Sequence, residues 1–180
     1  MAAVDNQFEI DVIRIRDEAR AHMEAGPVTE SYGGDKDRLI EVLNDVVATE
    51  IVCFLRYSQH AIAATGIDRA QVAAEFREHA GEEMQHGLRA AERISQLGGS
   101  PDFDPGSLVT RSHTEYVTTD EADLDRMLRE NLVAERIVIT TYQEIIRWIG
   151  DNDPTTRRLM ESILEEEEEH ADDLKDLLGS

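Results

Sequence analysis

The sequence predicts an all-α fold, a four-helix bundle with a long crossover between its second and third helices. Three observations lead to this prediction. The helix formers Ala, Glu, Leu and Arg are abundant, whereas the 180 residues include only 4 Pro and 11 Gly. Four long amphipathic runs follow one another along the chain. The connections between these runs also differ in length, which restricts how the helices can be joined.

The first 34 residues are predicted to be an N-terminal extension. Apolar residues there are scattered among charged ones, and Gly26-Pro27 and Gly33-Gly34 interrupt the pattern. Residues 35–180 then form one bundle domain, which is long enough to bury a sizeable core.

The first two runs are expected to form one antiparallel pair. The first spans about 35–64 and stops just before Gly66. Asp68 can cap the second run, which continues to about Leu97 and ends at a pair of glycines. Only a few residues separate the two runs, as in a helical hairpin.

The last two runs are expected to form a second hairpin. The third begins near Asp120, where Thr119-Asp120-Glu121 supplies a cap and early negative charge, and it ends at Gly150. The fourth begins at Pro154, because proline suits the first position of a helix.

The connection between the hairpins is much longer than the connections within them. It contains about 20 residues, from Gly98 to Thr119. Twenty extended residues can reach roughly 65–70 Å, whereas a helix of 30 residues is about 45 Å long. The link can therefore run the whole length of the bundle, as in the connectivity with one long crossover.

The composition excludes several classes of function. The formal net charge is −21, which would repel a phosphate backbone, so we expect no direct nucleic-acid binding. The single cysteine, Cys53, excludes an intrachain disulfide and a cysteine-based zinc site. No stretch approaches the roughly 18 apolar residues of a membrane span, and the N-terminal residues show no basic region followed by an apolar run, so we expect a cytoplasmic protein.

One motif occurs twice, a lone glutamate followed by Glu-x-x-His on the next helix. Glu50 precedes Glu83-x-x-His86 by 33 positions, and Glu135 precedes Glu167-x-x-His170 by 32. Residues three apart share a helix face, and all four glutamates lie near mid-helix, so the six side chains can meet inside the bundle. Four buried carboxylates would be hard to tolerate without cations, and two divalent ions balance them.

These ligands predict a site for two metal ions. Carboxylates and imidazoles without thiolates suit iron, manganese or zinc better than copper. We expect Glu50 and Glu135 to be terminal ligands and Glu83 and Glu167 to bridge the ions. The alternative is that Glu-rich helices produce Glu-x-x-His by chance, but the matched spacing of the two copies favours a metal site.

Further residues repeat beside the motif. Tyr57 and Tyr142 each lie seven positions after a lone glutamate, on nearly the same helix face. Each phenol can donate a hydrogen bond to a bridging carboxylate or donate an electron; alternatively, both tyrosines are core residues. Glu82 and Glu166 each precede a histidine of the motif by four positions and are candidates to orient its second nitrogen.

The chain resembles the ferritin superfamily, in its bacterioferritin and Dps-like branch, in four motifs. These are Glu50-x6-Tyr57, Glu83-x2-His86, Glu135-x6-Tyr142 and Glu167-x2-His170. The resemblance covers about residues 36–178. It implies a ferritin-like bundle that binds two Fe ions per subunit, a ferroxidase that oxidises Fe(II) with O2 or H2O2, and storage of ferric mineral inside a hollow homo-oligomeric shell. Such a protein limits oxidative stress by consuming iron and peroxide.

The resemblance favours a shell of twelve subunits over one of 24. Only ten residues follow His170, which leaves no room for the fifth helix of bacterioferritins. Dps-like proteins with a bacterioferritin-type site often carry a cysteine pair, but Ile137 stands where one of the pair would be expected. Met84 occupies the position of the haem-ligating methionine of bacterioferritin, yet haem is not expected because Glu-Glu-Met arises easily by chance.

Two alternatives remain open at this point. One is a di-iron or di-manganese enzyme of peroxidase or catalase type that does not store metal. The other is a non-enzymatic acidic bundle that serves as a binding or shell component, which predicts no tight metal binding.

Overall fold

The computed structural model describes residues 9–67, 69–118 and 123–179. It divides the chain into two compact units, one ending at Tyr32 and the other beginning at Gly33. In the first unit, helix α1 (Val12–Ala21) is followed by the short 3-10 turn η1 (Met23–Ala25), and α1 buries none of its side chains. The predicted division into an extension and a bundle domain at residue 34 stays a prediction.

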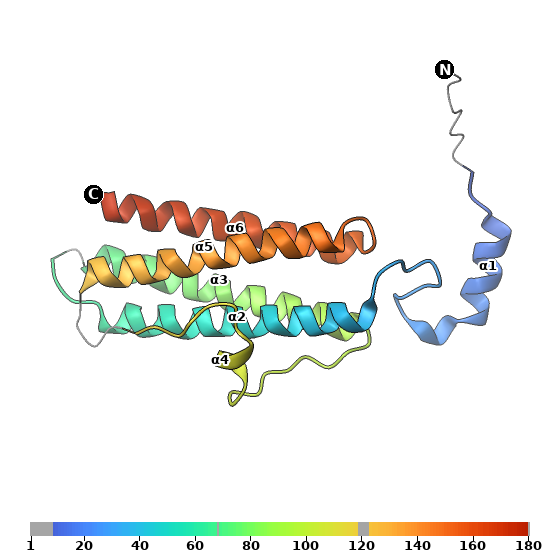
Figure 1. The fold of residues 1–180 in the computed structure, drawn as a ribbon, viewed down its shortest axis with the longest axis horizontal. Coiled ribbons are helices and arrows are strands. Elements are labelled where there is room, and N and C mark those ends of the chain that lie inside the picture. The colour runs from blue at the N-terminus through green and yellow to red at the C-terminus, as the bar shows by residue number, and fades with distance from the viewer. Residues whose placement is uncertain (1–8, 68, 119–122, 180) are drawn as a thin grey trace, which may run out of the picture. The chain divides into compact units, whose positions relative to one another are not determined.

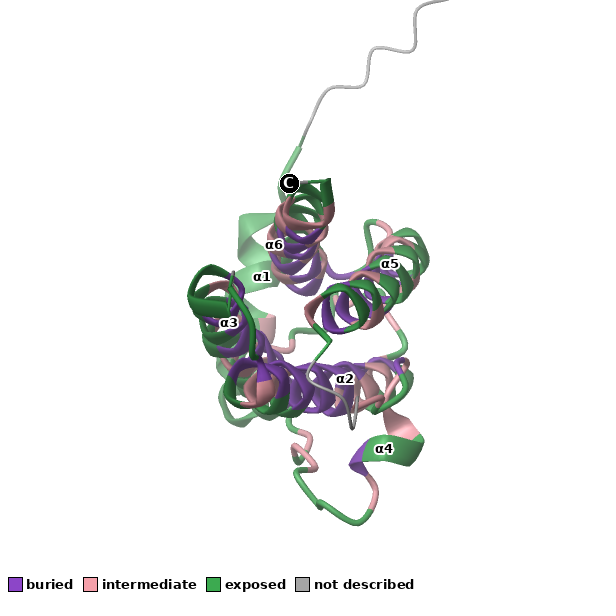
Figure 2. Ribbon diagram, turned by 90° about the vertical axis from the view of Figure 1, so that its left-hand side faces the viewer, coloured by how far each residue is buried: buried purple, intermediate pink, exposed green. Residues whose placement is uncertain are grey.

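The second unit contains four long helices that lie side by side (Figure 1). They are α2 (Lys36–Ala63), α3 (Arg69–Gln96), α5 (Leu124–Ile149) and α6 (Pro154–Gly179). The described residues contain no strand, so the predicted all-α bundle is confirmed. Viewed along the bundle, the buried faces of these helices converge on its centre (Figure 2). The site described below lies within that buried region.

The helix ends follow from local chemistry. The carboxylate of Asp35 accepts a hydrogen bond from the backbone N–H of Arg38 at the start of α2. Pro154 is the first residue of α6, as predicted. Gly150 follows α5 with φ +53°, a left-handed conformation that glycine adopts without strain. Gly150 and Pro154 thus mark the end of α5 and the start of α6, between which the chain turns.

The start of the third long helix differs from the prediction. Helix α5 begins at Leu124 and is capped by Asp123, whose side chain accepts from the N–H of Arg126. The predicted cap, Thr119-Asp120-Glu121, lies outside the described residues, as does the predicted cap Asp68 of α3. The sequence analysis therefore overlooked Asp123 as the cap.

The crossover between the hairpins runs along α2 and contains a short helix, α4 (Leu108–Arg111), that was not predicted. Near its start, the N–H of Asp102 donates to the side chain of Asn44 at 2.8 Å. Near its end, the guanidinium of Arg56 donates to the carbonyl of Glu115 at 3.2 Å. The crossover thus follows α2 for at least the twelve residues between Asn44 and Arg56, as its length predicts.

Candidate metal centre

The six predicted ligands meet inside the bundle. Each lies in the middle part of a long helix, and none is more than 2% exposed. Helices α2 and α5 each contribute one carboxylate, and α3 and α6 each contribute a carboxylate and an imidazole three residues apart. The six are Glu50, Glu83, His86, Glu135, Glu167 and His170. The predicted juxtaposition is therefore found in the structure.

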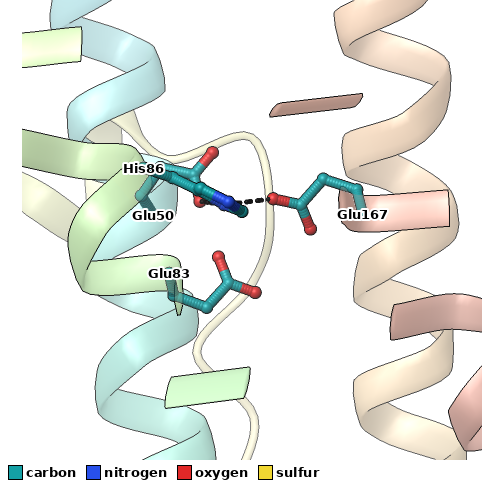
Figure 3. A group of neighbouring side chains, drawn as sticks. All are labelled: Glu50, Glu83, His86 and Glu167. Carbon is teal, nitrogen blue, oxygen red and sulfur yellow. Dashed lines mark hydrogen bonds and ion pairs between the residues drawn. The ribbon is translucent and has the colours of Figure 1, made fainter. Parts of the chain in front are cut away.

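These residues form two overlapping groups, in each of which one donor atom from every residue lies within 4.8 Å of the others. The first group is Glu50, Glu83, His86 and Glu167, and Figure 3 shows its side chains pointing toward one another. The second group replaces Glu50 and His86 with Glu135 and His170. Glu83 and Glu167 belong to both groups, which is the arrangement expected of carboxylates shared by two ions.

Helix α3 approaches α2 closely at this level of the bundle. A Cβ atom built on Gly87 would lie 3.3 Å from the Cβ of Glu50, closer than most side-chain contacts. Glycine at this position lets the backbone next to His86 come near Glu50, so the two candidate ligands can face the same point.

Each imidazole presents its Nδ1 to the carboxylates of the site. Nδ1 of His86 lies 2.9 Å from Glu167 and 3.6 Å from Glu50. Nδ1 of His170 lies 3.5 Å from Glu167 and 3.7 Å from Glu83. Both rings therefore point one nitrogen inward, where an ion would lie, and the other outward.

The outward nitrogens pair with the two predicted orienting glutamates, but across the helices. Nε2 of His86 lies 2.9 Å from Glu166, and Nε2 of His170 lies 2.9 Å from Glu82. The sequence analysis assigned each glutamate to the histidine four positions later on its own helix, which was wrong.

The two predicted tyrosines are buried and tie α2 to α5. The phenol of Tyr57 donates a short hydrogen bond to Glu135, and the phenol of Tyr142 donates one to Glu50. The sequence analysis expected a bridging carboxylate as the partner; the phenols instead reach the two carboxylates expected to be terminal. Each tyrosine thus fixes the orientation of a candidate ligand on the opposite hairpin.

Several donor atoms of the centre lack any hydrogen-bond partner. Both oxygens of Glu83 are buried and unpaired. The same holds for one oxygen each of Glu50, Glu135 and Glu167 and for Nδ1 of His170. Buried polar atoms are almost always paired in folded proteins, so six unpaired atoms converging on one place indicate a missing partner. Oxygen and nitrogen donors of these types fit two divalent transition-metal ions.

Burial and close contacts shift the acidities of these groups. Burial raises the pKa of Glu83 and of Glu135 well above the usual value. Burial lowers the pKa of both imidazoles, but their carboxylate contacts outweigh it and raise the pKa of His86 to about 11 and that of His170 to about 9. Burial opposes ionisation of Glu167, yet its close contacts with the imidazoles of His170 and His86 leave its pKa below the usual range.

A small acidic cavity lies beside the centre, between α3 and α6. Its volume is about 80 Å³, and its walls consist of six carboxylates and two imidazoles: Glu75, Glu78, His79, Glu82, Glu166, Glu169, His170 and Asp173. The sequence analysis did not single out His79, although Glu75, His79 and Glu83 recur every fourth position on one helix face. The ring of His79 stacks on that of His170, with 4.1 Å between their centroids.

Comparison with known proteins agrees with this geometry. A family model described as a ferritin-like domain matches residues 40–180. The chain belongs to the ferritin-like family. This ferritin-like chain is 31% identical over 137 residues to the bacterioferritin of Desulfovibrio desulfuricans, covering 75% of this chain and 71% of the relative. It is 28% identical over 152 residues to the DNA protection during starvation protein of Pyrococcus furiosus, covering 84% and 82%.

A solved structure is similar as well. The bacterioferritin-related protein of Bacteroides fragilis, described as a dodecameric thioferritin, is 36% identical to this ferritin-like chain and superposes with a TM-score of 0.79. The match covers 82% of this chain and 88% of that protein. The predicted resemblance to bacterioferritin and Dps proteins is thus confirmed, and the buried carboxylate–histidine groups are those of a candidate di-metal site.

The helices carry no candidate membrane span. Among residues 9–67, 69–118 and 123–179, no helix is both long enough and apolar enough to cross a bilayer.

Proposed function

We propose that this protein is a ferroxidase that oxidises Fe(II) at the buried centre and retains the ferric product in an oligomeric shell. The observation that carries the proposal is the set of six unpaired donor atoms on the predicted ligands, converging from four helices. A bundle held together by packing alone has no reason to bury these groups unpaired, because each costs about 1–3 kcal/mol.

In the proposed site, His86 and Glu50 hold one iron, and His170 and Glu135 hold the other. Glu83 and Glu167, which belong to both groups, are shared between the two ions. Manganese or zinc can occupy the same donors. The role of each residue as a ligand is part of the proposal.

The reaction treats Fe(II) as a substrate. Two Fe(II) ions together lose two electrons; with two protons these reduce O2 to H2O2, or H2O2 to two molecules of water. Each ion becomes Fe(III). The chain's part is to hold both ions at one place, so that both electrons are available to one oxidant.

The residues around the ligands hold them in position. The phenols of Tyr57 and Tyr142 fix Glu135 and Glu50 by hydrogen bonds. Glu166 and Glu82 fix the two imidazoles through their outer nitrogens, and Arg89 in turn donates to Glu166 at 3.0 Å. Partners of this kind keep the ring orientation and raise the basicity of the ligand. We propose that either phenol can also supply an electron.

Storage requires a shell, and we propose one of twelve copies of this chain. Support comes from the Bacteroides fragilis relative, which is dodecameric and 36% identical. The net charge of −21 suits a surface that collects cations and argues against direct DNA binding by this chain. Cytoplasmic localisation stays a prediction.

An aerobic Fe(II) titration of the metal-free protein tests the proposal. Ferric absorbance is followed while iron that remains with the protein is counted after gel filtration. Uptake far beyond two irons per chain supports storage. Saturation at two, or oxidation without retention, would point to a non-storing di-iron or di-manganese enzyme. Glu83→Ala and His170→Ala should abolish oxidation; unchanged oxidation in both would refute the assigned centre.

A further inference from the structure

The candidate centre has two halves, which we name by their histidines: the His86 half, with Glu50, and the His170 half, with Glu135. We propose that the buried guanidinium of Arg56 weakens metal binding in the His170 half relative to the His86 half. The inference rests on the proposed function, because it concerns the ions of that centre. The charge of an arginine is permanent in a protein, so its effect does not depend on pH.

Arg56 brings a positive charge into the core without an ion-pair partner among its hydrogen bonds. It is 1% exposed, and in the described part of the chain its guanidinium donates to three neutral acceptors. Nε donates to the amide oxygen of Asn131 at 2.9 Å and Nη1 to the carbonyl of Glu115 at 3.2 Å. Nη2 donates to the sulfur of Cys53 at 3.3 Å, and burial raises the pKa of that thiol to about 12. A buried charge is costly, so Arg56 requires opposite charge near it.

The guanidinium lies on the side of the His170 half. Asn131, which accepts from it, is one helical turn before Glu135 on α5. Its Cζ is 5.9 Å from the ring centroid of Tyr57, whose phenol donates to Glu135. Burial lowers the pKa of Arg56, but nearby negative groups, with Glu135 first among the candidate ligands, raise it further. Glu50, by contrast, is six residues away on α2, or about 9 Å along the helix axis.

The internal repeat places this charge in one hairpin only. The sixth residue after the lone glutamate is Arg56 in the first copy and Thr141 in the second. The residue four positions before that glutamate is Val46 in the first copy and Asn131 in the second. Val46 is fully buried and offers no side-chain acceptor, so the second copy lacks both the guanidinium and the amide that would hold it. The two copies share their ligands and tyrosines, and Arg56 therefore makes the two halves electrostatically unequal.

Coulomb repulsion gives the size of the effect. With an effective dielectric constant of about 20, a divalent ion about 8–10 Å from a unit charge is bound roughly fivefold more weakly than one about 3 Å farther away. The repulsive energy scales with the charge of the ion, so the same displacement is worth roughly tenfold for a trivalent ion. Oxidation to Fe(III) thus increases the difference between the halves. We expect the ferric ion of the His170 half to leave the centre first.

Co(II) binding to each half alone tests the proposal without any oxidation. His86→Ala leaves the His170 half, and His170→Ala leaves the His86 half. Arg56→Gln should tighten Co(II) binding about fivefold more in H86A than in H170A. Each comparison keeps one half intact, so the other charges around that half cancel, including those of the acidic cavity beside His170. Equal effects of R56Q in the two backgrounds would overturn the proposal.

The control Asn131→Leu removes the same hydrogen bond but keeps the charge of Arg56. It should not tighten Co(II) binding in either background, whereas tightening equal to that of R56Q would mean that the anchor, and not the charge, is responsible. Circular dichroism checks that each variant folds. If R56Q does not fold, Arg56→Met, which retains an unbranched apolar stem, replaces it in the same comparison.

Proton NMR of the intact centre provides a second measurement. At one Co(II) per chain, the ratio of chains with paramagnetically shifted His170 ring protons to those with shifted His86 ring protons should be about fivefold higher in R56Q than in wild type. An unchanged ratio in protein that binds two Co(II) would overturn the role of Arg56 and leave the proposed function standing. A wild type that binds no Co(II) would instead overturn the proposed function.

A second dose of Fe(II) tests which ferric ion leaves. After two Fe(II) per chain have been oxidised in air, wild type should regain the initial oxidation rate about tenfold sooner than R56Q, because its His170 half releases Fe(III) faster. N131L should recover as wild type does. Equal recovery times in wild type and R56Q would overturn the role of Arg56 in product release.

Discussion

Replacing Glu83 with leucine is expected to stabilise the metal-free protein and to remove most of its stabilisation by metal. Both carboxylate oxygens of Glu83 are buried without a hydrogen-bond partner. An unsatisfied buried polar atom costs about 1–3 kcal/mol, so the pair costs roughly 2–6 kcal/mol when no metal is bound. Imperfect packing of the branched leucine offsets about 1–3 kcal/mol of that gain. At the middle of these two ranges, the net gain is about 2 kcal/mol.

Thermal unfolding measured by circular dichroism, with EDTA and with Mn(II), checks this prediction at one fixed protein concentration. In a chain of this size, 1 kcal/mol moves Tm by about 2–4 °C, so a gain of about 2 kcal/mol raises Tm by roughly 4–8 °C. Metal at a hundred times its Kd adds about 2.7 kcal/mol per site to the wild type. Because E83L lacks a ligand that both ions share, metal should reverse the order of the two Tm values.

The matched control is Glu92→Leu, at an exposed position of the same helix. It should change stability by less than about 0.5 kcal/mol and leave the response to metal intact. If E83L instead unfolds below wild type in EDTA, the carboxylate of Glu83 contributes to the packing of the metal-free bundle. That result would refute the reasoning that its burial is a cost offset by metal.

Three further predictions concern the groups that hold the ligands. Tyr142→Phe removes the phenol bonded to Glu50 and should weaken metal binding about 10–100-fold in a Co(II) competition titration; an unchanged affinity would contradict this. Glu166 contacts His86, so in double-mutant cycles of metal affinity the effect of Glu166→Gln should be non-additive with that of His86→Ala and additive with that of His170→Ala. Additivity with His86→Ala and non-additivity with His170→Ala would instead mean that Glu166 acts on the histidine of its own helix. Since their pKa values are raised to about 11 and 9, both imidazoles should be protonated at pH 7 without metal, and the pKa values of Glu83 and Glu135 are raised as well; calorimetry in different buffers should therefore find two or more protons released per chain on metal binding. The raised pKa values of the imidazoles also stabilise the metal-free fold fully below pH 6.5, and this contribution is lost as pH rises through 9 and then 11, while metal affinity increases. Proton release near zero would show that the imidazoles are neutral before metal binds.

The candidate ligands were predictable because a position within a helix fixes the face on which its side chain lies. Glu83 and His86 share a face whatever the neighbouring helices do, and the same holds for Glu167 and His170. The hairpin lengths then place the four glutamates at one level. Nothing beyond helix geometry and chain length is needed for these steps, and the structure brings all six residues together.

Features that depend on contacts between helices were not predictable in the same way. Glu82 lies four residues before His86, but the distance from Glu82 to His170 depends on how α3 and α6 pack, which spacing along one helix does not determine. The same applies to Asp173, which reaches the acidic cavity beside His79 from the facing helix. The spacing of Glu75 and His79 was visible in the sequence, yet it had no repeated counterpart to distinguish it from chance.

The polar bonds of the centre join the two hairpins to each other. Two phenol–carboxylate bonds connect α2 to α5, and three imidazole–carboxylate bonds connect α3 to α6. The apolar packing within each hairpin does not require metal, whereas carboxylates from both hairpins face one another where the hairpins meet. Cations bound at the proposed centre would therefore offset repulsion at the interface between the hairpins. Metal should accordingly stabilise the docking of the hairpins more than the helices themselves, and amides near mid-bundle on α5 and α6 should gain more protection from hydrogen exchange than those at the helix ends.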